Sequence, residues 1–227
     1  MCSEATYLIS EIGSAIPTRP WAATLRPERF ERITGRDALK QVLFGLDTAS
    51  VAEFASIKVN MVWMPGTNDD EIEDMIGYCR DRGFILRLIE KMPMGASVPK
   101  KSFSGLQQLI ARIQKKYGLI DGVILGGGPA RYLVSPDKAF SIGFITPLSQ
   151  HFCATCNRVR MTVGGTLHLC LGQEDRLDLM PLLRGGASDS DSDIELAIMA
   201  AIYRKPERHQ FLETLIKPVR FMSMTGG

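Results

Sequence analysis

Apolar residues recur at two different spacings in the first half of the chain. Every third or fourth position is apolar over residues 26–49, after Asn68 and after Ser102, which predicts three amphipathic helices. Asn68 and Glu71 have capping-box spacing, so the second helix is expected to begin there and to end at Gly83. Residues 56–65 and 84–93 are short and largely apolar, which predicts strands. Helices and strands that alternate with such short connections predict βα units and a parallel sheet.

The pattern changes after residue 120. Residues 122–134, 139–148, 157–163 and 166–171 are short apolar stretches separated by glycine and proline, which is typical of strands in an antiparallel sheet. Gly164 and Gly165 are expected to form the hairpin turn between the last two stretches. A final helix is predicted after Ser192 and Glu195, which have capping-box spacing. The sequence therefore predicts an α/β part followed by an α+β part with a small antiparallel sheet.

Composition narrows the class of protein. With 227 residues, of which 45% are hydrophobic and 23% charged, the chain is typical of a globular protein and long enough to bury a core without disulfides. A net charge of +2 without a strongly basic block argues against a nucleic-acid partner, and no apolar run reaches the roughly 18 residues of a membrane span. The first residues lack the features of a signal or transit peptide, so a cytoplasmic location with reduced thiols is expected.

Three cysteines lie close together, and clustered cysteines in a cytoplasmic protein favour metal binding over disulfides. Cys153, Cys156 and Cys170 follow the pattern C-x2-C-x13-C, and the hairpin returns the third toward the first two. A thioredoxin-like redox pair is disfavoured because it needs a helix that begins at the C-x-x-C, whereas a strand is predicted there. Two metal sites remain open: zinc, with His168 as the fourth ligand, or an iron–sulfur cluster with three cysteine ligands and one open iron.

Two arginines follow the first cysteine pair. Arg158 and Arg160 are two residues apart on a predicted strand, so both are expected on one face beside Cys156. Guanidinium groups suit phosphate oxygens because each can form two charge-assisted hydrogen bonds. The structural alternative is a pair of solvated strand arginines.

Cations also interrupt the two predicted parallel strands. Lys58 and Asn60 share one face of the first strand, and Arg87 lies within the second, although a strand covered by helices should be apolar on both faces. An ion pair of Arg87 with Glu90 is the structural alternative. Two adjacent strands that each carry a cation predict an anion-binding cleft.

Residues 152–170 closely resemble the C-terminal cluster segment of the GTP 3',8-cyclases, the radical S-adenosylmethionine enzymes that begin molybdenum cofactor synthesis. The C-x2-C-x13-C spacing, the N-R-x-R run and the "LCL" of residues 169–171 all match. So do "IKVNMV", "LRLIEKMP", "GPARYL" and "IYRKPERH", in the family's order, and the final Gly-Gly. The resemblance runs from about Thr24 to Gly227.

The resemblance implies a fold and a division of the chain. The fold is an incomplete (βα) partial TIM barrel of the radical S-adenosylmethionine type, followed by a C-terminal α+β extension. Residues 1–23 would be an atypical N-terminal segment, residues 24–118 the second half of the barrel, and residues 119–227 a C-terminal cluster and GTP-binding domain.

The resemblance also implies a reaction. In this family one 4Fe–4S cluster cleaves S-adenosylmethionine, and the resulting radical leads to cyclisation of GTP to (8S)-3',8-cyclo-7,8-dihydroguanosine 5'-triphosphate. A second 4Fe–4S cluster, held by three cysteines, binds the purine through its open iron. The family's partners are the downstream cyclic pyranopterin monophosphate synthase, an electron donor protein and a second copy of the chain.

Site residues follow from their positions in the family's motifs. The resemblance assigns the second cluster to Cys153, Cys156 and Cys170, and GTP to Lys58, Arg87, Arg158, Val159 and Arg160. Met92 would contact S-adenosylmethionine, although it is a core residue by default. Gly226 and Gly227 match the terminal double glycine, which reaches the active site where a Cβ would clash. A frayed terminus is the structural alternative for these glycines.

The chain departs from the family at its N-terminal end. The family's first cluster requires C-x3-C-x2-C, whereas Cys2 is the only cysteine before Cys79. The chain is therefore expected to be the second half of the enzyme, as a truncation, a gene with a displaced start or one piece of a split protein. Catalysis by this chain alone is not expected. Two alternatives stay open: a non-catalytic iron–sulfur or nucleotide-binding remnant, and a structural zinc protein.

Overall fold

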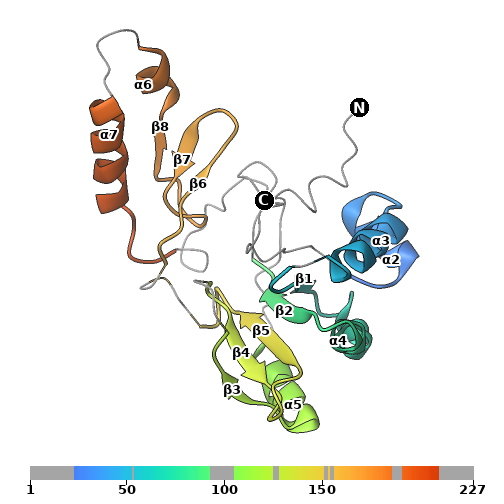
Figure 1. Ribbon diagram of the computed structural model, residues 1–227. Helices are drawn as coiled ribbons and strands as arrows, with labels where there is room; N and C mark the ends of the chain where they lie inside the picture. The colour runs from blue at the N-terminus through green and yellow to red at the C-terminus, as the bar shows by residue number, and fades with distance from the viewer. Residues whose placement is uncertain are drawn as a thin grey trace. The chain divides into compact units, whose positions relative to one another are not determined.

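The computed structural model describes residues 23–52, 54–92, 105–124, 128–150, 153, 156–185 and 191–209. These residues fall into two compact units, each with its own sheet (Figure 1). The first unit contains residues 23–91 and 105–149, and the second contains Met92 and residues from 150 to 209. None of the described helices has both the length and the apolar composition needed to span a membrane.

The first unit is built on a mixed five-stranded sheet. Its strands are β1 (Lys58–Trp63), β2 (Ile85–Glu90), β3 (Ile120–Gly122), β4 (Arg131–Val134) and β5 (Ser141–Ile145), in the order β1-β2-β5-β4-β3. β2 is parallel to β1 and to β5, whereas β4 is antiparallel to β5 and to β3. The predicted α/β class and the parallel pairing of the first two strands are therefore confirmed.

The prediction that the strands after residue 120 form an antiparallel sheet of their own is wrong for β5. β5 pairs in parallel with β2, so one sheet continues across the predicted boundary between residues 118 and 119. Short connections make β3–β4 and β4–β5 antiparallel neighbours, but they do not determine which larger sheet the last strand joins. Ile142 and Phe144 decide this, because they pack with β2 in the main core. The functional division at that boundary remains a prediction.

The helices of the first unit are α2 (Pro27–Thr34), α3 (Leu39–Ser50), α4 (Ile72–Asp81), which follows the short 3-10 turn η1 (Asp69–Glu71), and α5 (Gln107–Tyr117). The single helix predicted over residues 26–49 is wrong, because the chain turns at Gly35 between α2 and α3. Gly35 has a φ of 75°, and its amide donates to the Glu31 carbonyl at 2.7 Å. This left-handed conformation ends a helix and suits glycine, since a Cβ would be strained there. Ser102, after which the third helix was predicted, lies outside the described residues.

The turn before α4 does not contain the predicted capping box. The side-chain amide of Asn68 donates to the carbonyls of Ala23 and Val62, each at 2.9 Å. The buried carboxylate of Glu71 accepts a hydrogen bond from the Thr24 hydroxyl at 2.6 Å. Both side chains therefore anchor residues 23–24 near the end of β1 instead of capping the helix.

The two faces of this sheet differ in polarity. Alternate strand residues pack with the helices in one hydrophobic core; they are Val59, Met61, Trp63, Leu86, Leu88, Leu133, Ile142 and Phe144. Lys58, Asn60 and Arg87 belong to the opposite face, because residues alternate across a strand and the pairing of β1 with β2 keeps them in step. The first unit therefore presents one apolar face to its helices and carries polar residues on the other.

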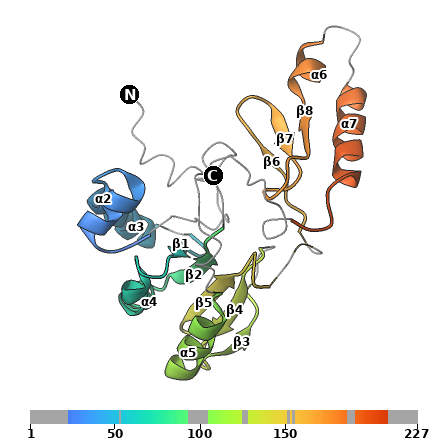
Figure 2. The same cartoon turned by 180° about the vertical axis from the view of Figure 1, so that it is seen from behind.

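The second unit contains a small antiparallel sheet, as predicted. Its elements are β6 (Arg160–Met161), β7 (Thr166–His168), β8 (Arg176–Asp178), α6 (Met180–Arg184) and α7 (Asp191–Tyr203) (Figure 2). α7 already contains Ser192 and Glu195, which were predicted to precede it. The core of the unit buries Leu167, Leu169, Leu179 and Ala201, with Ile194 and Ile198 packed against it. This apolar contact fixes α7 against the rest of the unit.

Gly164 and Gly165 form the predicted turn between β6 and β7. Gly165 has a φ of 77°, and its amide donates to the Thr162 carbonyl at 3.0 Å. A Cβ on Gly165 would lie 2.7 Å from Cγ of Met180. Both the backbone conformation and the available space therefore favour glycine. The turn sets the pairing of Arg160 with His168.

Candidate functional site

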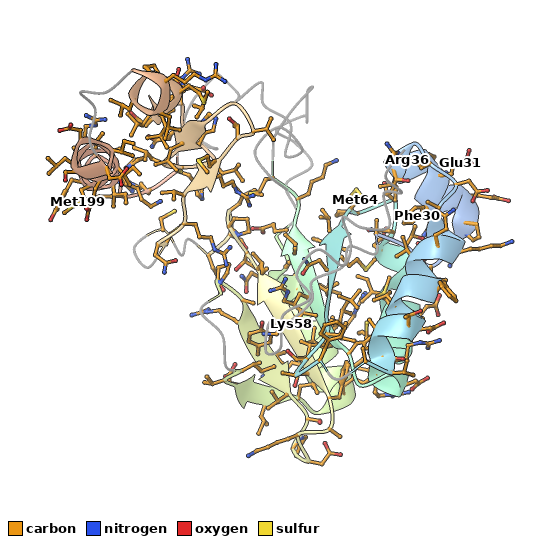
Figure 3. The ribbon with its side chains drawn as sticks, turned by 45° about the horizontal axis from the view of Figure 1, so that its top comes forward. Phe30, Glu31, Arg36, Lys58, Met64 and Met199 are labelled. Carbon is orange, nitrogen blue, oxygen red and sulfur yellow. The ribbon has the colours of Figure 1, made fainter. Side chains whose placement is uncertain are left out.

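Lys58 and Arg87 lie on neighbouring strands of the first unit, on the polar face of its sheet (Figure 3 labels Lys58). Lys58 is 4% exposed, Arg87 is 5% exposed, and Asn60 is 4% exposed. Arg87 Nε donates a hydrogen bond of 2.8 Å to Oδ1 of Asn60, its direct partner in the pairing of β1 with β2. Cations in a buried, low-dielectric setting attract an anion more strongly than cations in water. The structure thus brings together the two cations predicted in the first half of the chain.

The position of Glu90 does not support an ion pair with Arg87, which was the structural alternative for that arginine. Because residues alternate along β2, Glu90 belongs to the face opposite Arg87. Its Oε2 accepts hydrogen bonds from the amides of Leu148 and Ser149, at 2.9 and 3.0 Å. The carboxylate is therefore used to hold the backbone that follows β5.

A row of directly paired residues crosses the polar face of the sheet, and it consists of Asn60, Arg87, Gly143 and Tyr132. Gly143 leaves the space that its neighbours in the row occupy. A Cβ added to Gly143 would lie 2.7 Å from Cε1 of Tyr132 and 3.0 Å from Cγ of Arg87. A side chain at this position would therefore displace the tyrosine ring or the stem of the arginine.

We expect Gly143→Ala to lower the free energy of unfolding by about 1–3 kcal/mol, because the added methyl group overpacks this row. Gly77→Ala is the matched control: it lies in α4, and a Cβ there would meet nothing within 4 Å. Its stability should be unchanged or higher by up to about 1 kcal/mol, because alanine favours the helix. Urea denaturation followed by circular dichroism measures both. Wild-type stability for Gly143→Ala would contradict the packing of Arg87 and Tyr132 over this glycine.

The three clustered cysteines have free, half-buried side chains. The Cys156 amide donates to the Cys153 carbonyl at 3.0 Å, which makes a turn between the first two. β6 and β7 pair Arg160 with His168. The Lys205 ammonium lies 3.9 Å from the Cys156 sulfur and 2.9 Å from the Leu169 carbonyl, so the residue before Cys170 lies near Cys156. The hairpin therefore returns the third thiol toward the first two.

The surroundings of Cys170 shift its pKa. Burial raises the pKa of Cys170 above its ordinary value; a backbone amide and the Lys205 ammonium lower it, and the thiols of Cys153 and Cys156 raise it. Metal binding requires deprotonated thiolates, whose negative charges a bound cation would compensate. Cys79 differs, because it is fully buried in the first unit and burial raises its pKa to about 12. It is a residue of the main hydrophobic core.

No three histidine, cysteine, aspartate or glutamate side chains within the described ranges are placed to hold a metal ion. A zinc site of Cys153, Cys156, Cys170 and His168 needs such convergence, so the zinc alternative gains no support. An iron–sulfur cluster distributes its ligands over several irons, and its thiolates therefore surround a volume instead of meeting at a point. The donor set, three cysteines of the second unit that form no disulfide, fits a cluster with three cysteine ligands.

Arg160 begins β6, whereas Arg158 and Val159 precede the strand and are exposed. The strand predicted over residues 157–163 is shorter in the structure, because the turn to β7 already begins at Thr162. Arg158 lies outside the strand, so strand alternation does not place it on the face of Arg160, and the shared face of the two arginines stays a prediction. Both arginines still lie within four residues of Cys156 along the chain.

The remaining predicted residues are Met92, Gly226 and Gly227. Met92 lies two residues beyond β2 and is half-buried, so it is not a core residue. Its contact with S-adenosylmethionine remains a prediction. Gly226 and Gly227 lie outside the described residues.

Comparison with known proteins identifies the family. Residues 84–211 match the Molybdenum Cofactor Synthesis C family. The chain belongs to this family. It is 42% identical over 208 residues to GTP 3',8-cyclase of Ectopseudomonas mendocina and 41% identical over 208 residues to GTP 3',8-cyclase 2 of Pseudomonas aeruginosa. It is 42% identical over 211 residues to GTP 3',8-cyclase of Paracoccus denitrificans.

These alignments cover 90% of this chain but only 60–62% of each relative. The chain thus spans about three fifths of the length of the curated relatives it matches. The relatives are named as GTP 3',8-cyclases, and the matched family is named for molybdenum cofactor synthesis.

The sequence did not predict a role for two residues near the candidate sites, Gly143 and Lys205. Gly143 gave one usable signal, because a glycine inside a predicted strand indicates a close approach. Lys205 gave none. Its Nζ lies 3.9 Å from Sγ of Cys156, which is 49 residues away in the chain. Only the folded second unit reveals that contact.

Proposed function

We propose that this chain supplies the GTP-binding and C-terminal cluster part of a GTP 3',8-cyclase, which cyclises GTP to (8S)-3',8-cyclo-7,8-dihydroguanosine 5'-triphosphate at the start of molybdenum cofactor synthesis. Two contacts support this proposal: a turn joins Cys153 to Cys156, and Lys205 contacts both the Cys156 sulfur and the carbonyl before Cys170. The names of the relatives support the substrate. A partial (βα) barrel, to which β1, β2 and β5 would contribute, is part of the same proposal.

The thiolates of Cys153, Cys156 and Cys170 would hold a 4Fe–4S cluster. When bound, such a cluster supplies an iron with an open position, which can take a nitrogen or oxygen of the purine. The chain's own residues fix where that position lies. The turn at Gly164–Gly165 sets the register of the hairpin, and the half-buried setting of the thiols limits the access of water.

On the family's motifs, Arg158, Val159 and Arg160 are assigned to GTP, and so are Lys58 and Arg87. Guanidinium groups can each form paired charge-assisted hydrogen bonds with phosphate oxygens. Burial of Lys58 and Arg87 would strengthen their attraction for phosphate. Met92 is assigned to S-adenosylmethionine, and Gly226 and Gly227 to the active site, on the family's motifs alone.

Partners follow from the same proposal. The product would pass to a cyclic pyranopterin monophosphate synthase, an electron donor protein would supply reducing equivalents, and the chain would pair with a second copy. A cytoplasmic location remains the expectation from the sequence.

Cleavage of S-adenosylmethionine should be beyond the isolated chain. The 227 residues contain no C-x3-C-x2-C, the motif that holds the cleaving cluster in this family. We expect the cluster-loaded chain, reduced with dithionite, to release no 5'-deoxyadenosine, as measured by liquid chromatography with mass detection. The same chain without its cluster is the control. Release in proportion to the amount of cluster-loaded chain would contradict this part of the proposal.

Anaerobic reconstitution tests the proposed cluster. Iron, acid-labile sulfide and zinc are counted per chain after the wild-type protein has been offered all three. We expect about four irons and four sulfides per chain, held by thiolates. One zinc per chain with no uptake of iron would overturn the proposal in favour of a structural zinc protein.

A further inference from the structure

Lys205 links the last helix of the second unit to the cysteine hairpin. Its amide donates to the Ile202 carbonyl at 3.0 Å, which closes the end of α7. Its side chain is half-buried, and Nζ donates to the Leu169 carbonyl at 2.9 Å. Nζ also lies 3.9 Å from Sγ of Cys156, within hydrogen-bonding range of a sulfur. One ammonium group therefore contacts both segments that carry the clustered thiols.

The Leu169 carbonyl belongs to the peptide that leads into Cys170. Leu169 is fixed on two further sides, because its side chain is buried in the core of the unit and its amide donates to the Asp175 carbonyl at 3.1 Å. The bond from Lys205 completes the set of contacts. It therefore restricts the direction in which Cys170 leaves β7.

The position of the ammonium group is determined by the fold. α7 packs on the sheet through Ala201, four residues before Lys205, with Ile194 and Ile198 beside it. Arg204, the preceding residue, is exposed. Of these two adjacent cations, Lys205 is the one that contacts the Cys156 sulfur and the Leu169 carbonyl.

The charge of Lys205 matters once the thiols ionise. Three thiolates held together in a half-buried site repel one another, and a fixed cation 3.9 Å from one of them offsets part of this repulsion. Hydrogen bonds to the sulfurs and the local net charge are also among the factors that set the reduction potential of an iron–sulfur cluster.

We propose that Lys205 is a positioning residue for the C-terminal cluster: it holds the peptide before Cys170, donates a hydrogen bond to the Cys156 thiolate, and thereby stabilises the bound cluster and raises its reduction potential. The inference rests on the proposed function, since it requires that the three cysteines hold a cluster. It goes beyond the ligands themselves, because Lys205 would act through them.

Four forms of the full 227-residue chain test it after anaerobic reconstitution: wild type, Lys205→Met, Lys205→Arg and the matched control Arg204→Met. Two quantities are measured. The first is the rate at which a chelator removes iron, followed by the loss of cluster absorbance. The second is the midpoint potential of the cluster, from a mediated dithionite titration followed by electron paramagnetic resonance.

We expect Lys205→Met to lose its cluster about tenfold faster or more, the usual scale for removal of a residue that supports metal ligands. Its midpoint potential should be more negative, because a positive charge and a hydrogen bond to sulfur are lost. Lys205→Arg keeps both and should restore most of each property, and Arg204→Met should match wild type.

Wild-type values in Lys205→Met would overturn the inference. So would faster loss of iron with an unchanged potential and no rescue by Lys205→Arg, because that result would show a packing role only. If the wild-type chain takes up no iron, the proposed function itself fails, which separates the two outcomes.

Discussion

Cys156→Ala should leave the anaerobically reconstituted chain without its cluster. The thiol lies at the centre of the candidate site: it is joined to Cys153 by a turn, it approaches Lys205, and it influences the pKa of Cys170. Two remaining thiols cannot hold a cluster that already has one iron without a protein ligand. We expect iron and sulfide per chain to fall from about four to near zero, by the family's stoichiometry.

Cys79→Ala is the matched control for this loss. Cys79 is fully buried in α4, within the hydrophobic core of the first unit, so its thiol is packed among apolar side chains and is not accessible to a cluster. Its substitution should leave iron uptake intact while lowering the free energy of unfolding by about 1 kcal/mol, the typical cost of a small change in a core. Full iron uptake by Cys156→Ala, or loss of iron in Cys79→Ala, would place the metal site elsewhere.

Arg160→Ala should weaken the binding of GTP by roughly 1.5–3 kcal/mol, the typical worth of hydrogen bonds to charged groups. This corresponds to a loss of affinity of roughly ten- to hundredfold. GTP carries about four negative charges near neutrality, so the loss of one fixed cation should also reduce the salt dependence of binding. Guanosine has no phosphates, and its affinity should barely change.

The control for net charge is Arg184→Ala, which removes an exposed arginine of α6 in the same unit. It should bind GTP like wild type. Isothermal titration calorimetry of cluster-loaded protein at two salt concentrations measures all three chains. Equal GTP affinity in wild type and Arg160→Ala would identify Arg160 as a structural residue of β6.

Short-range features of this fold could be predicted from the sequence. The alternation of β1 and β2 correctly separated Lys58, Asn60 and Arg87 from the core residues, since side chains alternate wherever a strand is regular. The hairpin at Gly164–Gly165 was also predictable, because adjacent glycines are typical of such turns and Gly165 supplies the left-handed conformation. Both features depend on neighbours in the chain.

Features set by distant contacts could not be predicted in this way. β5 resembles the strands before it, yet it joins β2 because Ile142 and Phe144 complete the main core. Glu71 has capping-box spacing, but a buried carboxylate so close to Thr24 binds that hydroxyl instead. The candidate site shows the same difference. The spacing of the three cysteines predicted them as a group, whereas the contact of Lys205 with Cys156 depends on how α7 packs.

The most direct test of the central claim is the affinity of the wild-type, cluster-loaded chain for GTP and for guanosine, measured at low and high salt before and after a chelator removes the cluster. We expect GTP to bind more tightly than guanosine and the difference to shrink as salt rises. Removal of the cluster should weaken both ligands. Binding of GTP no tighter than that of guanosine, without salt dependence and unaffected by the cluster, would contradict a site in which thiolate-held iron takes the base and fixed cations take the phosphates.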